Sequence, residues 1–270
     1  MKVGISTYAY TWAIGVPSIM PDKPMDIHQF IEAAVANGVD LLQIADNLPL
    51  HALSDSELLA VKNHLKQLSL SVEIGIRGLT DTMMERYLGF AEYFQSPILR
   101  VVTDLINYTP TIQEIIAILE RWVPVAKANN ITLALENHDR FKVSDLIQIV
   151  SKFDVTEVGI CLDTVNSLGA LEGPDTVIKG LAPYTVNVHL KDFKISRPLH
   201  SMGFIVEGTI AGEGMLNIQS IFANPILQTR NPNVILELWT PFESTIGETV
   251  TKENDWVKKS IQNLKKLGLL

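Results

Sequence analysis

The stretch ITLALENHDR, residues 131–140, decides the fold, because within it an apolar run becomes a run of polar side chains. Branched and apolar residues alternate with Thr132 and Ala134, which is typical of a β-strand. A carboxylate, an amide, an imidazole, a second carboxylate and a guanidinium follow, from Glu136 to Arg140. An α/β barrel forms its active site from polar groups at the carboxyl ends of buried strands. We therefore predict a strand over residues 131–140 whose end faces a site.

Three later segments also end in one side chain that can bind a metal ion. These side chains are Asp163 in GICLDTVN, His189 in VNVHLKD and Glu237 in VILELW. Neighbouring strands of a sheet lie ~5 Å apart, so the ends of four parallel strands can surround one point. We expect these three side chains and Glu136 to converge on a single ion.

Strand-like and helix-like segments alternate along the whole chain. Strands are predicted at residues 3–8, 39–45, 71–76, 97–103, 131–140, 157–162, 185–190 and 233–238. Helices with one apolar face are predicted at residues 26–38, 54–68, 81–93, 111–126, 144–152 and 174–181, from residue 218, and at 253–267. Such βα units form a parallel sheet with right-handed crossovers. The sequence predicts an α/β protein, a single (β/α)8 TIM barrel over residues 1–270.

Composition limits the partners and the compartment. A barrel of this type needs ~250 residues, and the chain has 270. The net charge of −8 argues against nucleic acid as a partner, since that binding neutralises phosphates with Lys and Arg. No apolar run reaches the ~18 residues of a membrane span, and Ser6 and Thr7 interrupt a faint signal-like start. The single cysteine, Cys161, excludes an intrachain disulfide. We expect a cytoplasmic protein with a small-molecule carbohydrate substrate, and a homo-oligomer is possible.

The ligand types indicate which metal would bind. Three carboxylates and one imidazole form an oxygen-rich set, which favours one divalent Mn²⁺ or Mg²⁺, while Co²⁺ or Zn²⁺ stay possible. An octahedral ion with four protein ligands has about two positions left for substrate oxygens. A carbonyl and its neighbouring hydroxyl on a sugar would suit those positions. Glu136 and Glu237 can each also move a proton, because a carboxylate has a second oxygen.

Other side chains are predicted to contact the substrate. His138 and Lys191 each lie two residues beyond a predicted metal ligand, on the same side of the strand. We predict His138 as a second base or hydroxyl ligand, and Lys191 as a group that polarises a carbonyl or holds an anion. The alternatives are a hydrogen-bonded supporting role for His138 and simple neutralisation of the carboxylates by Lys191. Three more residues are predicted to bind the substrate: Arg100, Trp12 and Trp239. Arg100 could instead pair with Glu73. The two tryptophans are predicted to stack on the sugar ring, and the alternative is that they are ordinary loop residues.

The segments ALENHD, CLDTVN, VHLKD and LELW resemble the Glu, Asp, His and Glu metal-ligand segments of the xylose isomerase-like TIM-barrel superfamily. This group contains sugar isomerases and epimerases, inosose dehydratases and endonuclease IV. The resemblance implies metal ligands at Glu136, Asp163, His189 and Glu237, with the two Glu residues also moving protons. Ketose 3-epimerases commonly have a substrate-binding His three residues after the Asp ligand. Here that residue is Asn166, which we predict to contact the substrate.

Three functions follow as hypotheses. The first is a metal-dependent isomerase or epimerase acting on a sugar, keto sugar or sugar acid through deprotonation next to a carbonyl. The second is a lyase of the same superfamily, a dehydratase or a 3-oxo acid decarboxylase, in which Lys191 or Arg140 holds a carboxylate. The third is a non-catalytic sugar-binding barrel. The sequence does not choose a substrate; its nearest candidate for a phosphate loop is GTIAGEG, residues 208–214.

Overall fold

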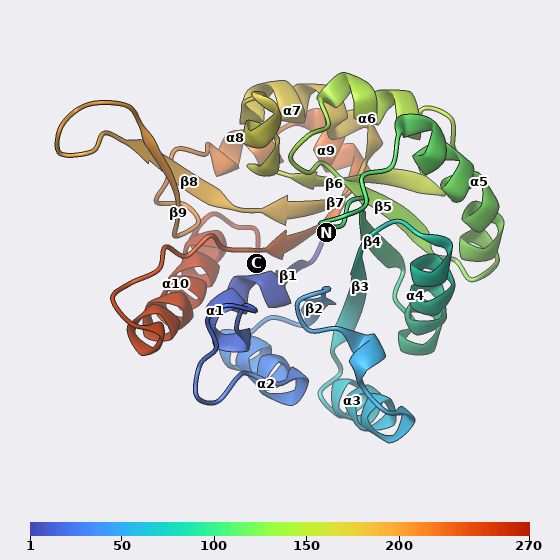
Figure 1. Cartoon of the computed structure of the whole chain (residues 1–270), viewed down its shortest axis with the longest axis horizontal. Coiled ribbons are helices and arrows are strands. Elements are labelled where there is room, and N and C mark those ends of the chain that lie inside the picture. Colours follow the sequence, from blue (N-terminus) through green and yellow to red (C-terminus); the bar gives the residue numbers. More distant parts are fainter.

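The computed structural model describes residues 1–270, and eight parallel strands form a closed barrel at its centre (Figure 1). Going around the barrel, the strands are β1 (Val3–Ser6), β2 (Leu41–Ile44), β3 (Ser71–Arg77), β4 (Ile98–Val102), β5 (Thr132–Glu136), β6 (Val158–Asp163), β7 (Thr185–Leu190) and β10 (Asn233–Leu236). Parallel pairing of β1 with both β2 and β10 closes the barrel. The predicted (β/α)8 fold is confirmed.

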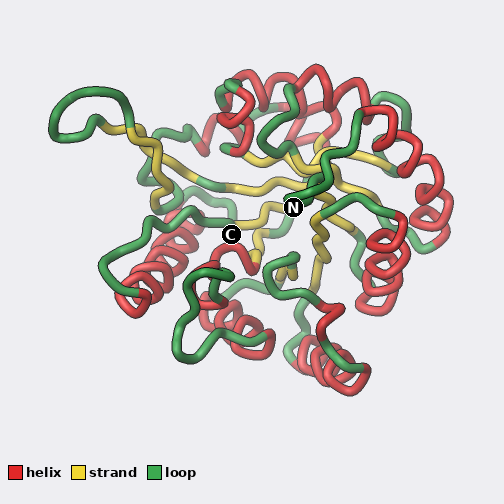
Figure 2. The backbone as a smooth tube through the Cα atoms, in the orientation of Figure 1, coloured by secondary structure: helices red, strands yellow, loops and turns green.

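Helices surround the barrel (Figure 2). They are α1 (Thr11–Ile14), α2 (Ile27–Asn37), α3 (Asp55–Gln67), α4 (Asp81–Phe94), α5 (Ile112–Ala128), α6 (Val143–Val150), α7 (Pro174–Leu181), α8 (Ile218–Phe222), α9 (Pro225–Arg230) and α10 (Ile246–Lys266). Asp26, Ser54 and Thr111 each form a capping box at the start of α2, α3 and α5. These caps satisfy backbone N–H groups that a helix leaves free in its first turn.

Side chains alternate along each strand between the layer that packs against the helices and the inside of the barrel. In β5, Leu133 and Leu135 belong to a core cluster of 60 buried residues that includes side chains of the helices. Ala134 points to the opposite face, where it packs with Ile98 and Cys161 in a cluster of 3 residues. Little apolar volume therefore fills the inside of the barrel, and polar side chains occupy much of it.

Two predicted boundaries are wrong by four residues or more. The strand predicted over residues 131–140 ends at Glu136, because the Asn137 side chain bonds to the backbone of Asp163 and Asp139 adopts φ +44°. The last helix begins at Ile246 rather than at residue 253, because the Thr245 side chain accepts a hydrogen bond from the backbone of the first turn. None of the helices is both long and apolar enough to cross a membrane.

Residues 192–209, which follow β7, form an antiparallel hairpin. Its strands are β8 (Asp192–Ser196) and β9 (Ile205–Thr209), and it extends away from the barrel at the left of Figure 1. The backbone N–H groups of Gly212 and Gly214 both donate to Asp192 Oδ2, each at 2.9 Å. The stretch that came nearest to a phosphate loop thus binds a carboxylate of its own chain.

Candidate functional site

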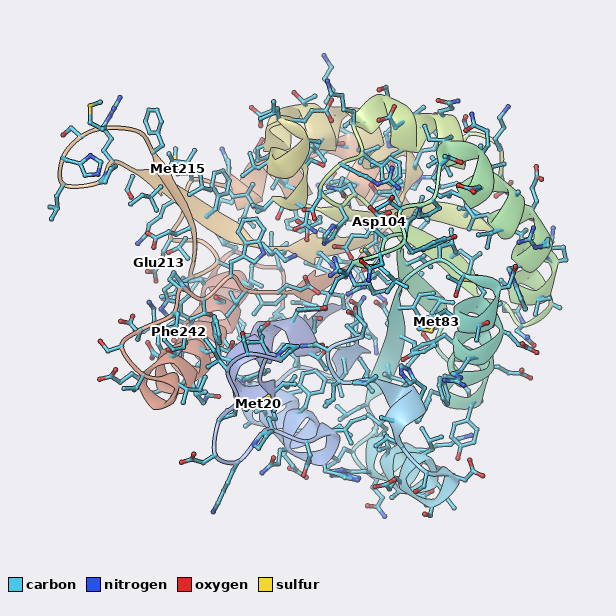
Figure 3. All side chains as sticks on the ribbon, in the orientation of Figure 1. Met20, Met83, Asp104, Glu213, Met215 and Phe242 are labelled. Atoms are coloured by element: carbon cyan, nitrogen blue, oxygen red, sulfur yellow. The ribbon has the colours of Figure 1, made fainter.

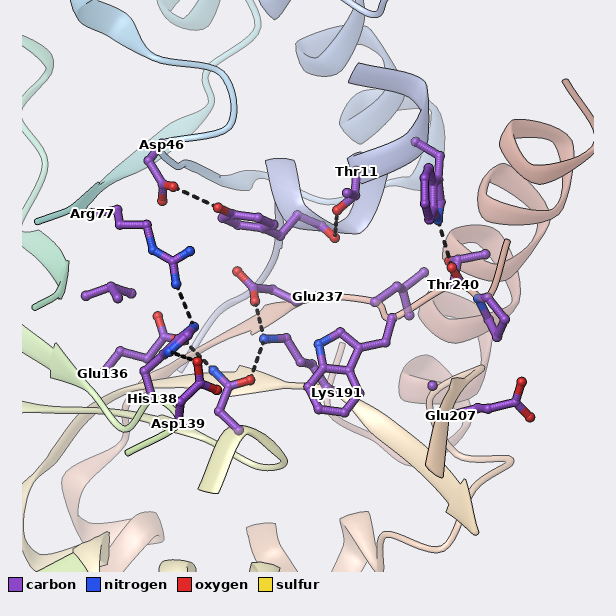
Figure 4. Close-up of a pocket in the computed structure, with 18 of the residues that line it drawn as sticks. Thr11, Asp46, Arg77, Glu136, His138, Asp139, Lys191, Glu207, Glu237 and Thr240 are labelled. Atoms are coloured by element: carbon purple, nitrogen blue, oxygen red, sulfur yellow. Dashed lines mark hydrogen bonds and ion pairs between the residues drawn. The ribbon is translucent and has the colours of Figure 1, made fainter. Parts of the chain in front are cut away.

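The predicted metal ligands lie together at the carboxyl end of the barrel. Glu136 and Asp163 are the last residues of β5 and β6, His189 is in β7, and Glu237 directly follows β10. Each is at most 4% exposed. Beside them opens a cavity of about 550 Å³, which Glu136 and Glu237 help to line (Figure 4).

The distances place His189 at the centre of this group. Ligand atoms of Asp163, His189 and Glu237 lie within 4.8 Å of one another. His189 Nδ1 is 3.4 Å from Glu237 Oε1 and 3.5 Å from Glu136 Oε2. Glu136 also forms a second such group with Cys161 and His189. Strand ends that are far apart in the sequence thus bring three candidate carboxylate ligands around one imidazole.

Several of these ligand atoms have no hydrogen-bond partner. They are Glu136 Oε2, Asp163 Oδ2, Glu237 Oε1 and both ring nitrogens of His189. The oxygens do have charged neighbours: Arg100 Nε lies 3.1 Å from Glu136 Oε2, Lys191 Nζ 2.7 Å from Asp163 Oδ2 and His189 Nδ1 3.4 Å from Glu237 Oε1. Most buried polar atoms in proteins do have a partner, so such a cluster needs an explanation. Hard oxygen donors with one imidazole fit a divalent cation.

The charges around the site keep two of its acids ionised. Burial raises the pKa of Glu136, but Arg100 and His189 outweigh it and hold that pKa at about 2. Burial also raises the pKa of Glu237, and there His189 and Lys191 hold it well below its usual range. Both carboxylates are therefore anionic at neutral pH, the form that binds a metal ion.

Lys191 and Asn166 connect the site carboxylates, and Figure 4 shows Lys191 beside Glu237. Lys191 Nζ lies 2.7 Å from Asp163 Oδ2 and 2.8 Å from Glu237 Oε2. Asn166 donates from Nδ2 to Glu136 Oε1 at 2.7 Å and accepts from Lys191 at 3.3 Å. Both side chains also line the cavity, so they can neutralise the carboxylates and meet a substrate. Their predicted substrate contacts stay predictions.

The guanidinium of Arg100 is bound by two carboxylates and a carbonyl of the protein itself. Its Nε lies 3.1 Å from Glu136 Oε2, and its Nη1 donates to Asp46 Oδ1 at 3.2 Å and to the carbonyl of Ile76 at 3.0 Å. The alternative pairing with Glu73 is wrong, because Glu73 binds amide side chains instead. Arg100 borders the cavity and orients Glu136.

The aromatic candidates line the same cavity. Trp12 donates from Nε1 to the carbonyl of Thr240 at 2.7 Å and packs against Phe242, with ring centroids 5.1 Å apart. The Trp239 ring lies 5.7 Å from Lys191 Nζ. Both indoles thus have structural contacts, and both still face the space a ligand would fill.

Arg77 is a cavity residue that the sequence interpretation missed. It ends β3, and its Nη2 contacts His138 Nε2 at 3.0 Å, while His138 Nδ1 lies 2.9 Å from Asp139 Oδ2. Arg77 forms no ion pair with a carboxylate, unlike Arg100 and Lys191. The inference that identified Glu136, a polar residue at the end of a predicted strand, applies equally to Arg77, which directly follows the predicted strand at residues 71–76.

Arg140, one of the two groups considered for holding a substrate carboxylate, is used elsewhere. It binds Asp104 with two hydrogen bonds, from Nε at 2.7 Å and from Nη2 at 2.9 Å. It is not among the residues that line the cavity. That assignment is wrong for Arg140, whereas Arg77 lines the cavity.

Comparisons with known proteins agree with this architecture. The chain is 32% identical over 264 residues to 3-oxo-isoapionate decarboxylase from Pectobacterium atrosepticum, covering 98% of this chain and 95% of that protein. The structure of D-psicose 3-epimerase with D-tagatose from Clostridium cellulolyticum H10 matches with a TM-score of 0.71 at 16% identity, covering 100% of this chain and 99% of that one. A xylose isomerase-like TIM barrel protein from Mycobacterium smegmatis in complex with magnesium matches with a TM-score of 0.70 at 16% identity, covering 100% of this chain and 98% of that one.

The two structural matches show a shared fold, since their identities are low. The match to a family model is more specific, because it spans residues 19–267 of the 270 in the chain. Together with the decarboxylase relative, it confirms the predicted resemblance. The chain belongs to the xylose isomerase-like TIM-barrel family.

Proposed function

We propose that this protein is a divalent-metal-dependent lyase that decarboxylates a small 3-oxo sugar acid. The observation that carries the proposal is Arg77, a guanidinium without a carboxylate partner in the cavity beside the candidate metal ligands. Arginine suits a planar carboxylate, because its N–H groups can bind both oxygens. The 3-oxo-isoapionate decarboxylase relative supports the same reaction type.

The reaction needs positive charge near the oxo group and a proton donor. Loss of CO₂ breaks the bond between the carboxyl carbon and its neighbour, and the electron pair moves toward the oxo oxygen. A divalent cation held by Glu136, Asp163, His189 and Glu237, Mg²⁺ or Mn²⁺ in our proposal, supplies charge that stabilises this electron shift. A proton must then reach the carbon that lost the carboxyl group.

The chain's own residues are assigned the remaining roles. Arg77 binds the carboxylate and sets its direction relative to the oxo group. Lys191, whose pKa is raised by Asp163 and Glu237 despite its burial, stays protonated and donates a hydrogen bond to an oxygen of the substrate. His138, half-buried at the cavity wall, accepts from Arg77 at Nε2; when the substrate carboxylate takes that Arg77 N–H, Nε2 is free to take up a proton from solvent and deliver it to carbon. Trp12 and Trp239 pack against the apolar face of the substrate.

The test measures CO₂ release and deuterium incorporation with metal-loaded protein and a set of short 3-oxo sugar acids in D₂O. We expect CO₂ and one deuterium on the carbon that carried the carboxyl group. Arg77→Met should lower kcat/KM for the acid by roughly 100-fold, the effect of losing a hydrogen bond to a charged group. Arg77→Lys should recover part of it. Arg121→Met is the matched control, because Arg121 pairs with Asp81 on the surface.

A second candidate is the isomerase or epimerase. One observation favours it: Glu136 and Glu237 both approach His189 Nδ1, so two carboxylates flank the ion position and could exchange a proton with either side of a substrate carbon. This function predicts deuterium exchange next to the carbonyl of neutral keto sugars, without CO₂, and no effect of Arg77→Met. Sugar binding with neither reaction would overturn both candidates and leave the binding barrel.

A further inference from the structure

One buried carboxylate away from the candidate metal ligands has no cation as a partner. Glu253 lies in α10 and is 1% exposed. Its Oε1 accepts a hydrogen bond from the backbone N–H of Trp12 and its Oε2 accepts one from that of Ala13, each at 2.9 Å. Glutamate side chains are almost never fully buried unless they are paired with a cation, so this one needs a reason.

The two N–H groups belong to a helix that cannot satisfy them itself. The helix α1 is a single turn, and no side chain caps its start. The first N–H groups of any helix have no partner within that helix, and a helix this short is not stable alone. The helices α1 and α10 are in contact (Figure 1). Glu253 therefore supplies, from α10, the acceptors that an N-cap residue normally supplies from its own helix.

The helix α1 forms part of the wall of the active-site cavity. Thr11 and Trp12 both line that cavity. The indole of Trp12 is held by the carbonyl of Thr240 and by the ring of Phe242, which is labelled in Figure 3. These two contacts fix the ring, whereas Glu253 fixes the backbone from which the ring projects. The position of this wall therefore depends on Glu253 as well.

We propose that Glu253 is a positioning residue, whose carboxylate holds α1 so that Thr11 and Trp12 form an ordered wall of the substrate cavity. Glu253 itself is not among the residues that line the cavity, so it acts on a substrate only through α1. The inference rests on the proposed function in one respect, which is that the cavity binds the substrate.

This role requires the ionised form of Glu253. Each of its oxygens accepts one N–H group, and in a protonated carboxyl the oxygen that carries the proton is a poor acceptor. Burial raises the pKa of Glu253 to about 7, and the N–H groups of Trp12 and Ala13 act against that rise. As pH falls through about 7, Glu253 takes up a proton and one of the two bonds weakens. Substrate binding should therefore weaken on the acid side of this value.

The elements packed against α10 bring no cation to Glu253. They are α1, α2 and the turn Thr7–Tyr10. In that turn, burial and the charge of Glu253 raise the pKa of Tyr10, and α1 has no titratable side chain. Charged and titratable groups on these elements and on α10 contact other partners: Tyr8 with Asp46, His28 and Glu32 with His64, Lys252 with Glu243, and Lys259 with Asp255.

The first test follows Trp12 by fluorine NMR in the full chain labelled with 5-fluorotryptophan. The chain has four tryptophans, and the signal of Trp12 is the one missing from Trp12→Phe. Between about pH 5 and about pH 9 this signal should shift with a midpoint of about 7, and it should not do so in Glu253→Gln. Trp122, which donates to Asp81 at the surface, gives the reference signal.

The second test separates substrate binding from turnover in the decarboxylation assay with metal-loaded protein. Glu253→Gln keeps the shape of the side chain and one acceptor oxygen. At about pH 8 it should raise KM by roughly 10-fold and change kcat less than about 3-fold, the effect of replacing a charged acceptor by a neutral one. At about pH 5.5 the KM values of wild type and variant should converge. Asp255→Asn is the matched control, because Asp255 is an exposed carboxylate of α10 paired with Lys259, and it should leave KM and the Trp12 signal unchanged.

Stability should change with pH in the opposite direction to substrate binding. The pKa of about 7 in the folded protein lies above the ordinary value of 4.5, so the proton on Glu253 stabilises the folded state. This contribution is full below about pH 4.5 and is lost as pH rises through about 7. The unfolding free energy in urea should therefore decline less with pH in Glu253→Gln than in wild type. Binding that tightens where stability falls distinguishes a positioning role from a purely structural one.

Three results would overturn the inference. One is a wild-type Trp12 signal that does not titrate, and this measurement needs no variant that folds. Another is a Trp12 titration that persists in Glu253→Gln, and the third is a Glu253→Gln protein with lower kcat and unchanged KM. If the wild type decarboxylates no 3-oxo acid, the proposed function fails, and the fluorine titration alone then supports or overturns the role of Glu253.

Discussion

Two sets of buried polar groups lie inside the same barrel, and their hydrogen bonding differs. The inner set surrounds Glu73, which accepts from Asn233 Nδ2 at 2.9 Å, from Asn187 Nδ2 at 2.8 Å and from Gln43 Nε2 at 3.4 Å. At the mouth, ligand oxygens of Glu136, Asp163 and Glu237 and the ring of His189 have no such partner. Glu73 is thus satisfied by neutral amides, whereas these ligand atoms at the mouth have only ion-pair contacts.

The difference separates a structural polar layer from a site built for a ligand. Burial raises the pKa of Glu73 and outweighs the amide hydrogen bonds and His189, which lower it, whereas Arg100 and His189 hold the pKa of Glu136 at about 2. A buried polar group without a hydrogen-bond partner lowers the stability of the folded state. Proteins retain such groups mainly at sites that bind a ligand. Substitutions in the two sets should therefore change different properties of the protein.

The largest expected effect is at the mouth. Glu237→Gln keeps the shape of the side chain and leaves Lys191 paired with Asp163, but removes one anionic ligand. We expect metal affinity to fall at least ~100-fold and turnover by on the order of 1000-fold. Elemental analysis, calorimetric titration with Mn²⁺ and activity assays measure this, and the thermal midpoint checks the fold. Metal binding equal to wild type would remove Glu237 from the ligand set.

The next largest effect is expected in the inner set, on stability instead of metal binding. Glu73→Ala removes the acceptor for three amides and should cost roughly 3 kcal/mol of unfolding free energy. Urea unfolding gives this value, and Mn²⁺ titration should be unchanged. If Glu73→Ala lost the metal while keeping its stability, the distinction between the two layers would fail.

A smaller effect concerns pH. The raised pKa of Glu73 means that the folded state binds this proton more tightly than the unfolded chain does. Its contribution to stability is therefore full below about pH 4.5 and is lost as pH rises through the raised value. Glu73→Gln cannot titrate, so its unfolding free energy should decline less above pH 4.5 than that of wild type. Parallel pH profiles would contradict this assignment.

The smallest effect is expected at Gln43, the weakest member of the inner set. Its bond to Glu73 is long, and its own Oε1 has no partner. Gln43→Leu should change the unfolding free energy by less than ~1 kcal/mol and leave metal binding unaltered. A loss as large as that of Glu73→Ala would show that the layer acts as a unit.

The sequence by itself determined the barrel and the four candidate ligands. Alternating strands and amphipathic helices permit few other folds, and the ends of parallel strands meet at one face whatever the loops do. Glu136, Asp163, His189 and Glu237 could therefore be grouped without coordinates, because each ends an apolar run. Their binding of a metal ion stays a prediction.

Only the tertiary structure decided which charges are free and where the chain leaves the barrel. Arg77, Arg100 and Arg140 are equally cationic in the sequence, yet the structure pairs two of them with carboxylates and leaves Arg77 facing the cavity. Likewise, residues 192–209 form a hairpin that extends from the barrel, because its two strands pair with each other and Asp192 anchors its base. Ion pairs and anchors of this kind join residues distant in the chain, and no local pattern encodes them.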